Sequence, residues 1–119
     1  MKSNPLDSNP FHLMGWKMPL SYAPHRFISE LPDCSGLYSI TYITKENQSN
    51  KIVYIGMSNR LFSRIGNGRH EVVRKMQEDG IFPNIWFKQF PQDGLLNEET
   101  KYIRMFNPSY NIRQKERSL

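Results

Sequence analysis

Residues 36–56 read GLYSITYITKENQSNKIVYIG, two apolar runs on either side of a polar segment. The runs 36–44 and 51–56 are rich in the β-branched and aromatic residues that favour strands. The polar residues 45–50 between them are typical of a turn, so this segment predicts a β-hairpin. Alternation along the first strand places Tyr38, Ile40 and Tyr42 on one face of the sheet.

The residues that follow the hairpin predict three helices and one further strand. Ser58-Asn59 is a plausible N-cap for a first helix, which Gly66 to Gly68 interrupt, and a second helix spans about 70–79. An apolar strand covers 84–90, and a last helix opens at Asp93-Gly94 and runs to about Phe106. The order β-β-α-α-β-α predicts a small α/β (α+β) domain with a mostly antiparallel three-stranded sheet flanked by helices.

The two ends of the chain have a different composition from this central domain. Residues 1–30 contain four prolines, which prevent a long helix or a central strand, yet they are too apolar for a free linker. We therefore expect an irregular arm (1–30) that packs on the domain (31–112). Residues 113–119 form a basic tail with Arg113, Lys115 and Arg117.

Size and composition predict one globular, cytoplasmic domain. The chain has 119 residues, of which 38% are hydrophobic, and it contains one cysteine, Cys34, which can form no internal disulfide. No apolar run approaches the roughly 18 residues that a membrane helix needs, and no secretory signal is recognisable. The sequence therefore predicts no membrane partner.

Positive charge is concentrated in one part of the chain. The formal net charge is +5, and between residues 60 and 75 five basic side chains accompany a single carboxylate, Glu71. Clustered positive charge is typical of surfaces that bind nucleic-acid phosphates, although a solvated helix face and a basic tail would look the same. The candidate DNA-binding residues are Arg60, Arg64, Arg69, Arg74 and Lys75.

One carboxylate lies within an apolar helix face. Leu95, Glu99, Tyr102, Ile103 and Phe106 share one side of the last helix. A carboxylate in that position is costly unless it is paired or bound to a metal. The sequence leaves two alternatives open, an ion pair of Glu99 with an arginine and a site for one Mg²⁺ or Mn²⁺ ion, which suit carboxylate oxygen.

Several short motifs follow one another in a recognisable order. Gly36-Leu37-Tyr38 precedes Tyr54-Ile55-Gly56, and Arg64 comes ten residues after Tyr54. Glu99 then opens a Glu-x-x-Tyr-Ile pattern, and residues 108–111 read PSYN. In this order and spacing, residues 31–112 resemble the GIY-YIG nuclease domain.

This resemblance implies metal-dependent hydrolysis of DNA phosphodiester bonds. Tyr38 would help to deprotonate the attacking water, and Tyr54 would hold the phosphate or assist the proton transfer. Arg64 would bind the phosphate, and Glu99 would hold one divalent ion. The family often has a histidine or tyrosine four residues after the arginine, where this chain has Gly68, so we assign that role to His70. Gly36, Gly56 and Asn111 would support the site structurally.

Two other functions remain open from the sequence. The first is a catalytically inactive nucleic-acid-binding module of the same fold, and the second is an interaction domain in which Tyr38 and Tyr54 are core aromatics. No separate DNA-recognition motif is present in the sequence. We therefore expect any target specificity to come from the arm, from loops, from a homodimer or from a partner protein.

Overall fold

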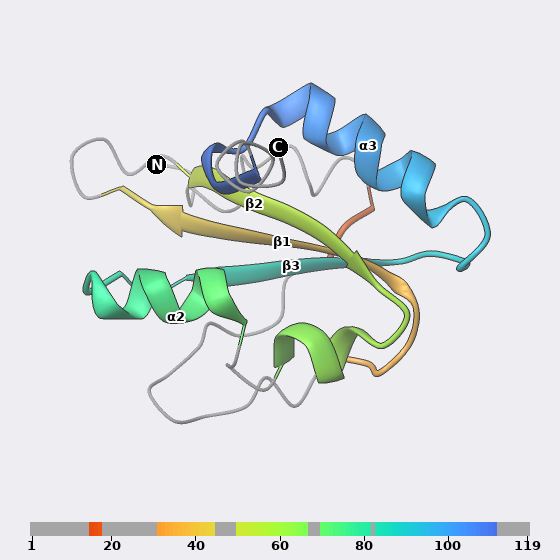
Figure 1. Cartoon of the computed structure of the whole chain (residues 1–119), viewed down its shortest axis with the longest axis horizontal. Coiled ribbons are helices and arrows are strands. Elements are labelled where there is room, and N and C mark those ends of the chain that lie inside the picture. Colours follow the sequence, from red (N-terminus) through yellow and green to blue (C-terminus); the bar gives the residue numbers. More distant parts are fainter. Residues whose placement is uncertain (1–14, 18–30, 45–49, 67–69, 82, 112–119) are drawn as a thin grey trace, which may run out of the picture.

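The fold was analysed in a computed structural model, which describes residues 15–17, 31–44, 50–66, 70–81 and 83–111. Its elements are β1 (Gly36–Ile43), β2 (Asn50–Ser58), η1 (Phe62–Gly66), α2 (Glu71–Glu78), β3 (Asn84–Gln89) and α3 (Leu95–Phe106). The strands form one antiparallel sheet in the order β2-β1-β3, so β1 is central (Figure 1). The predicted α+β class, the hairpin and the order of elements are confirmed.

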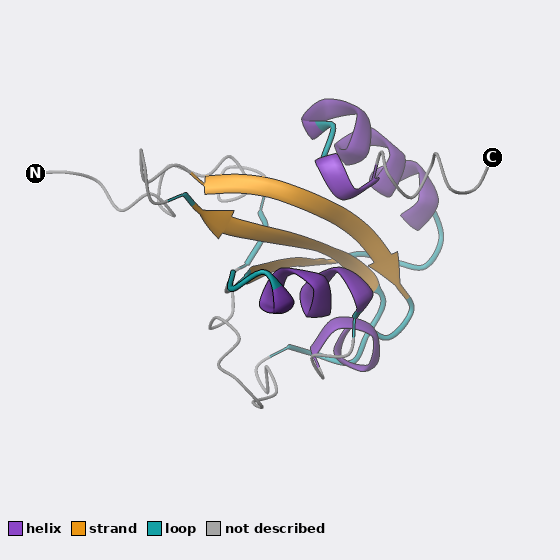
Figure 2. Cartoon of the chain, turned by 60° about the vertical axis from the view of Figure 1, so that its left-hand side comes forward, coloured by secondary structure: helices purple, strands orange, loops and turns teal. Residues whose placement is uncertain are grey.

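Helical elements cover both faces of the sheet. η1 and α2 lie against one face and α3 against the other, so the molecule has three layers (Figures 1 and 2). Successive side chains of β1 point to opposite faces of the sheet, so they belong to two separate core clusters. Tyr38 and Ile40 pack with Leu61 on the η1 and α2 side, whereas Leu37 packs with Trp86 on the α3 side. As predicted, Tyr42 packs on the same side as Tyr38.

The described part of the N-terminal arm packs on the domain. Lys17 and Phe87 exchange two backbone hydrogen bonds of 2.8 and 2.7 Å beside β3. The ring of Trp16 is buried and meets Tyr102 edge-on, with 5.1 Å between the ring centroids. The rest of the predicted arm, and the basic tail 113–119, lie outside the described residues.

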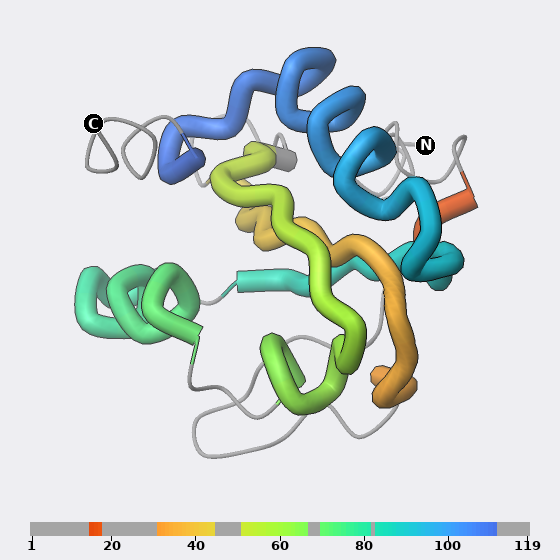
Figure 3. The backbone as a smooth tube through the Cα atoms, turned by 45° about the vertical axis from the view of Figure 1, so that its right-hand side comes forward, coloured from red at the N-terminus to blue at the C-terminus, as the bar shows by residue number. Residues whose placement is uncertain are grey.

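The predicted helix after Ser58 is a five-residue π-helical turn, η1. Ser58 does accept a hydrogen bond from the Arg60 N–H, but the following N–H groups bond elsewhere. The N–H groups of residues 61 and 62 donate to the carbonyls of Cys34 and Pro32, and that of residue 63 donates to the Asp33 carboxylate. Residues 32–34, which are distant in sequence, therefore take the place of the predicted cap. The tube in Figure 3 shows η1 and α2 as separate segments on the same side of the sheet. Within the described residues, no helix is long and apolar enough to cross a membrane.

We expect Gly56→Ala to destabilise the fold. A Cβ at position 56 would lie 2.5 Å from both Cζ and Oη of Tyr38, a ring enclosed by the core. Such overpacking costs about 1–3 kcal/mol, measurable by urea unfolding. Lys51→Ala, at an exposed position of the same strand, should change the unfolding free energy by less than about 0.5 kcal/mol. Equal unfolding midpoints for Gly56→Ala and the wild type would contradict this packing.

Candidate active site

Three aromatic rings from separate elements meet on the α2 side of the sheet. Tyr38 on β1 and Tyr54 on β2 stack with 6.0 Å between their centroids. His70 meets both tyrosines edge-on, at 5.4 Å from Tyr38 and 5.1 Å from Tyr54. The hairpin register pairs Tyr38 with Gly56 and Ile40 with Tyr54, which places the two tyrosines diagonally on one face. We call these three residues the ring cluster.

His70 connects the ring cluster to the start of α2. Its Nδ1 accepts the backbone N–H of Val72 at 3.1 Å and so caps the helix. A neutral imidazole that accepts at Nδ1 carries its proton on Nε2. Since Nε2 lies 2.9 Å from the Tyr38 hydroxyl, His70 donates and Tyr38 accepts. The side chain is fully buried, whereas a lone histidine at a helix start is usually exposed.

The hydrogen bonds of the ring cluster have a defined order of donors and acceptors. Burial, followed by the nearby charge of Arg64, lowers the pKa of His70 to about 4, so the ring is neutral at pH 7. Burial raises the pKa of both tyrosines, while a hydrogen bond from Tyr38 acts to lower the pKa of Tyr54. Tyr38 is 1% exposed and Tyr54 is 8% exposed. The order of donation is therefore His70 to Tyr38 to Tyr54, and Tyr54 is the more accessible end.

Among the described residues, Arg64 is the basic side chain whose charge acts on this cluster. It extends from η1, and its charge acts on Tyr38, Tyr54 and His70. Two hydrogen bonds, of 2.9 and 3.3 Å, join its Nη atoms to the two carboxylate oxygens of Glu71. The bond from Arg64 lowers the pKa of Glu71 to about 2. Sequence reasoning missed this partner, although Glu71 is the one carboxylate within the basic run 60–75.

Glu99 approaches the same region from the opposite layer. It lies on α3, is partly buried and accepts the backbone N–H of Met57 on β2. Burial raises its pKa, and its charge acts on Tyr54. Among the described residues no cation forms an ion pair with Glu99, so the predicted alternative of a paired arginine finds no support there.

A half-buried carboxylate of this kind fits a magnesium site. Mg²⁺ is often held by one or two carboxylates, with water and substrate phosphate as its other ligands. The described part of the chain contains no group of three or more His, Cys, Asp or Glu residues that could enclose an ion alone. Glu99 could therefore hold such an ion only with water or a bound molecule as its other ligands.

Asn111 fixes the outer edge of β2. Its amide donates to the Ile55 carbonyl and its carbonyl accepts the Ile55 N–H, both at 2.8 Å. Glu99 binds the next outward N–H of the same strand, that of Met57. The two side chains satisfy backbone groups that an edge strand would otherwise expose. Gly36 is also constrained, because a Cβ there would overlap the Lys88 carbonyl oxygen.

Three of the other predicted DNA-binding residues, Arg60, Arg74 and Lys75, are exposed on the surface. Arg60 is 72% exposed and pairs with Asp33 at 2.8 Å, so it does not share the environment of Arg64. Arg74 and Lys75 are exposed on α2, where Lys75 pairs with Asp79 at 3.3 Å. Arg69 lies outside the described residues.

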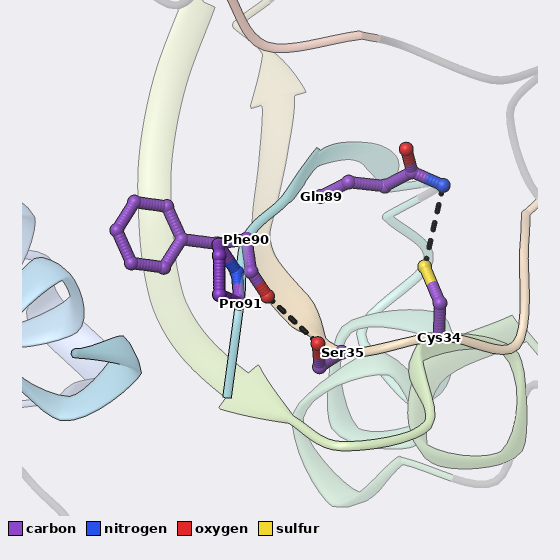
Figure 4. A pocket seen from close by; sticks show the side chains of 5 residues that line it. All are labelled: Cys34, Ser35, Gln89, Phe90 and Pro91. Carbon is purple, nitrogen blue, oxygen red and sulfur yellow. Dashed lines mark hydrogen bonds between the residues drawn. The ribbon is translucent and has the colours of Figure 1, made fainter. Parts of the chain in front are cut away.

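One hollow of the described surface lies elsewhere. It measures about 350 Å³ and is formed by residues 34–35 and 89–91, without a charged side chain (Figure 4). There Ser35 donates to the Phe90 carbonyl and Gln89 donates to the Cys34 sulfur. This hollow has no cationic side chain for a phosphate, whereas the charge of Arg64 acts on all three rings of the cluster, so we locate the candidate site at the ring cluster.

Comparisons with protein-family models, with curated proteins and with solved structures find no match for this chain.

We expect the stability of the domain to fall as the pH drops from about 6.5 to about 4. His70 binds a proton more weakly in the folded chain than in the unfolded chain, where its pKa is about 6.5. Its contribution is therefore complete above pH 6.5 and is lost towards pH 4, by about 3 kcal/mol at most. Urea unfolding at several pH values measures the change.

His70→Asn is the matched variant for this prediction. Asparagine caps helices well, so it can still accept the Val72 N–H, but it does not titrate. Between pH 6.5 and pH 4, the unfolding free energy of the variant should fall less than that of the wild type, because the contribution of His70 is absent. Equal pH dependence in the variant and the wild type would contradict the buried, neutral state of His70.

Proposed function

We propose that this domain is a divalent-metal-dependent DNA endonuclease of the GIY-YIG type, which hydrolyses phosphodiester bonds. The observation that carries this proposal is the convergence on Tyr54. The hydroxyl of Tyr38 donates to it, and the charges of Arg64 and Glu99 both act on it. Phosphodiester hydrolysis needs a proton acceptor, a cation for the phosphate and a ligand for a metal ion, and these residues supply one of each.

In this proposal Tyr54 is the residue that meets the substrate. The sequence assigned proton removal from water to Tyr38, but the almost complete burial of Tyr38 favours the more accessible Tyr54. A phenolate at Tyr54 would be stabilised by the hydrogen bond from Tyr38 and by the positive charge of Arg64. His70 and Tyr38 are then positioning residues, because each fixes the direction of the next hydroxyl.

Arg64 and Glu99 would hold the phosphate between them. The guanidinium of Arg64 can donate two parallel hydrogen bonds to phosphate oxygens and stays charged at any working pH. Glu99 would hold one Mg²⁺ or Mn²⁺ ion, which would polarise the phosphoryl group and neutralise the leaving oxygen. Target specificity would then come from other surfaces, from a homodimer or from a partner protein.

A catalytically inactive DNA-binding module is the second candidate. It is favoured by one observation, the burial that raises the pKa of both tyrosines and makes each a weaker base at neutral pH. Such a module would bind DNA with a strong salt dependence but would not cut it.

A plasmid-nicking assay with Mg²⁺ tests catalysis. We expect the wild type to nick DNA and Glu99→Gln to lose about a hundredfold in rate, the scale of losing one charge-stabilising group. Glu98→Gln is the matched control. It removes the same charge at the neighbouring position, where Glu98 pairs with Lys101 on the surface. Undiminished cutting by Glu99→Gln, or no cutting by the wild type with Mg²⁺ or Mn²⁺, would refute the proposal.

Thermal unfolding tests the metal site without reference to activity. At pH 7 we expect Glu99→Gln to be more stable than the wild type in the absence of metal, because a carboxyl whose pKa is raised by folding destabilises the folded state when it is ionised. Excess Mg²⁺ should raise the melting temperature of the wild type and of Glu98→Gln by several degrees, and that of Glu99→Gln hardly at all. Equal shifts in all three proteins would exclude Glu99 as the ligand.

A further inference from the structure

The arginine proposed to bind the phosphate already holds an anion of this chain. The two Nη atoms of Arg64 contact the two carboxylate oxygens of Glu71 in a parallel arrangement, at 2.9 and 3.3 Å. Carboxylate and phosphate offer a guanidinium the same pair of oxygen acceptors. In the described structure Glu71 therefore occupies the edge of Arg64 that a phosphate could use.

This ion pair can open readily. The side chain of Arg64 is 40% exposed and that of Glu71 is 56% exposed. Exposed ion pairs contribute little to stability, since water and salt screen both charges. An incoming phosphate diester can therefore exchange with the Glu71 carboxylate without disturbing the core.

Glu71 would remain well placed after the exchange. It is the first residue of α2, where the unpaired N–H groups of the helix favour negative charge, and its carboxylate also accepts its own backbone N–H. The preceding residue, His70, is fixed by its helix cap and by Tyr38. The carboxylate thus stays beside the site, ready to recapture Arg64 when the phosphate leaves.

We propose that Glu71 is a built-in competitor for Arg64, which occupies the phosphate-binding guanidinium until a nucleic-acid phosphate displaces it. This inference rests on the proposed function and goes beyond it. It makes Glu71 a residue that lowers the affinity of the site for phosphate and pairs with the charge of Arg64. Every phosphate that binds Arg64 must first displace this carboxylate, so its apparent affinity is reduced in proportion to the fraction of Arg64 that is free.

Binding of a short fluorescein-labelled DNA duplex, measured by anisotropy in EDTA at fixed salt, tests this role. We expect Glu71→Gln to bind about twofold to fivefold more tightly than the wild type, the range that corresponds to the loss of one exposed ion pair. Glu78→Gln is the matched control, because Glu78 is an exposed glutamate of the same helix and its loss changes the net charge equally. It should tighten binding less than Glu71→Gln does.

A double-mutant cycle with Arg64→Gln shows whether Glu71 acts through Arg64. We expect Glu71→Gln to have little effect on affinity in the Arg64→Gln background beyond that of Glu78→Gln. Weaker binding by Glu71→Gln would overturn the proposal, since it would make Glu71 a residue that positions Arg64 for DNA. Equal gains in both backgrounds would overturn it too, because they would reflect general repulsion of DNA.

The nicking assay keeps this inference distinct from the proposed function. If the wild type binds and nicks DNA but Glu71→Gln does not bind more tightly, the competitor role fails and the nuclease stands. If neither the wild type nor any variant binds DNA, both proposals fail. Melting temperatures of all variants confirm that each one is folded.

Discussion

The hydrogen bond from His70 to Tyr38 is the constraint on which the site depends. The N-terminus of α2 requires an acceptor, and the Nδ1 atom of His70 supplies it. That cap leaves the only imidazole proton on Nε2, which makes Tyr38 an acceptor and leaves its own proton for Tyr54. Helix capping, a requirement of the fold, thereby determines the direction of every hydrogen bond in the ring cluster.

The edge of β2 brings together groups from opposite layers of the fold. Tyr54 points towards the α2 side of the sheet. From the α3 side, Glu99 accepts the N–H of Met57. Asn111 binds the backbone of Ile55, which lies between Tyr54 and Met57 in the strand. Because β2 is an edge strand of the described sheet, no other described strand separates these groups. A phosphate at this edge could contact the arginine of one layer and the carboxylate of the other, which a central strand would not allow.

Much of this arrangement could be predicted from local patterns. Two runs of β-branched and aromatic residues around a polar turn located the hairpin, and a helical stripe located α3 and singled out Glu99. The burial of His70 and the pairing of Arg64 with Glu71 could not be predicted, because both depend on contacts between separate elements that no periodicity of the sequence reveals. The π-helical form of η1 was missed for a similar reason. Its leading N–H groups bind residues 32–34, which are remote in sequence.

The tautomer of His70 is the most direct test of this account. Nitrogen-15 NMR of the labelled protein distinguishes the two ring nitrogens, and the His70→Asn variant assigns the signals. At pH 7 we expect an unprotonated Nδ1 and a protonated Nε2, with a ring that stays neutral well below pH 6. A proton on Nδ1, or a pKa near 6.5, would contradict the cap, the bond to Tyr38 and the order of donation to Tyr54.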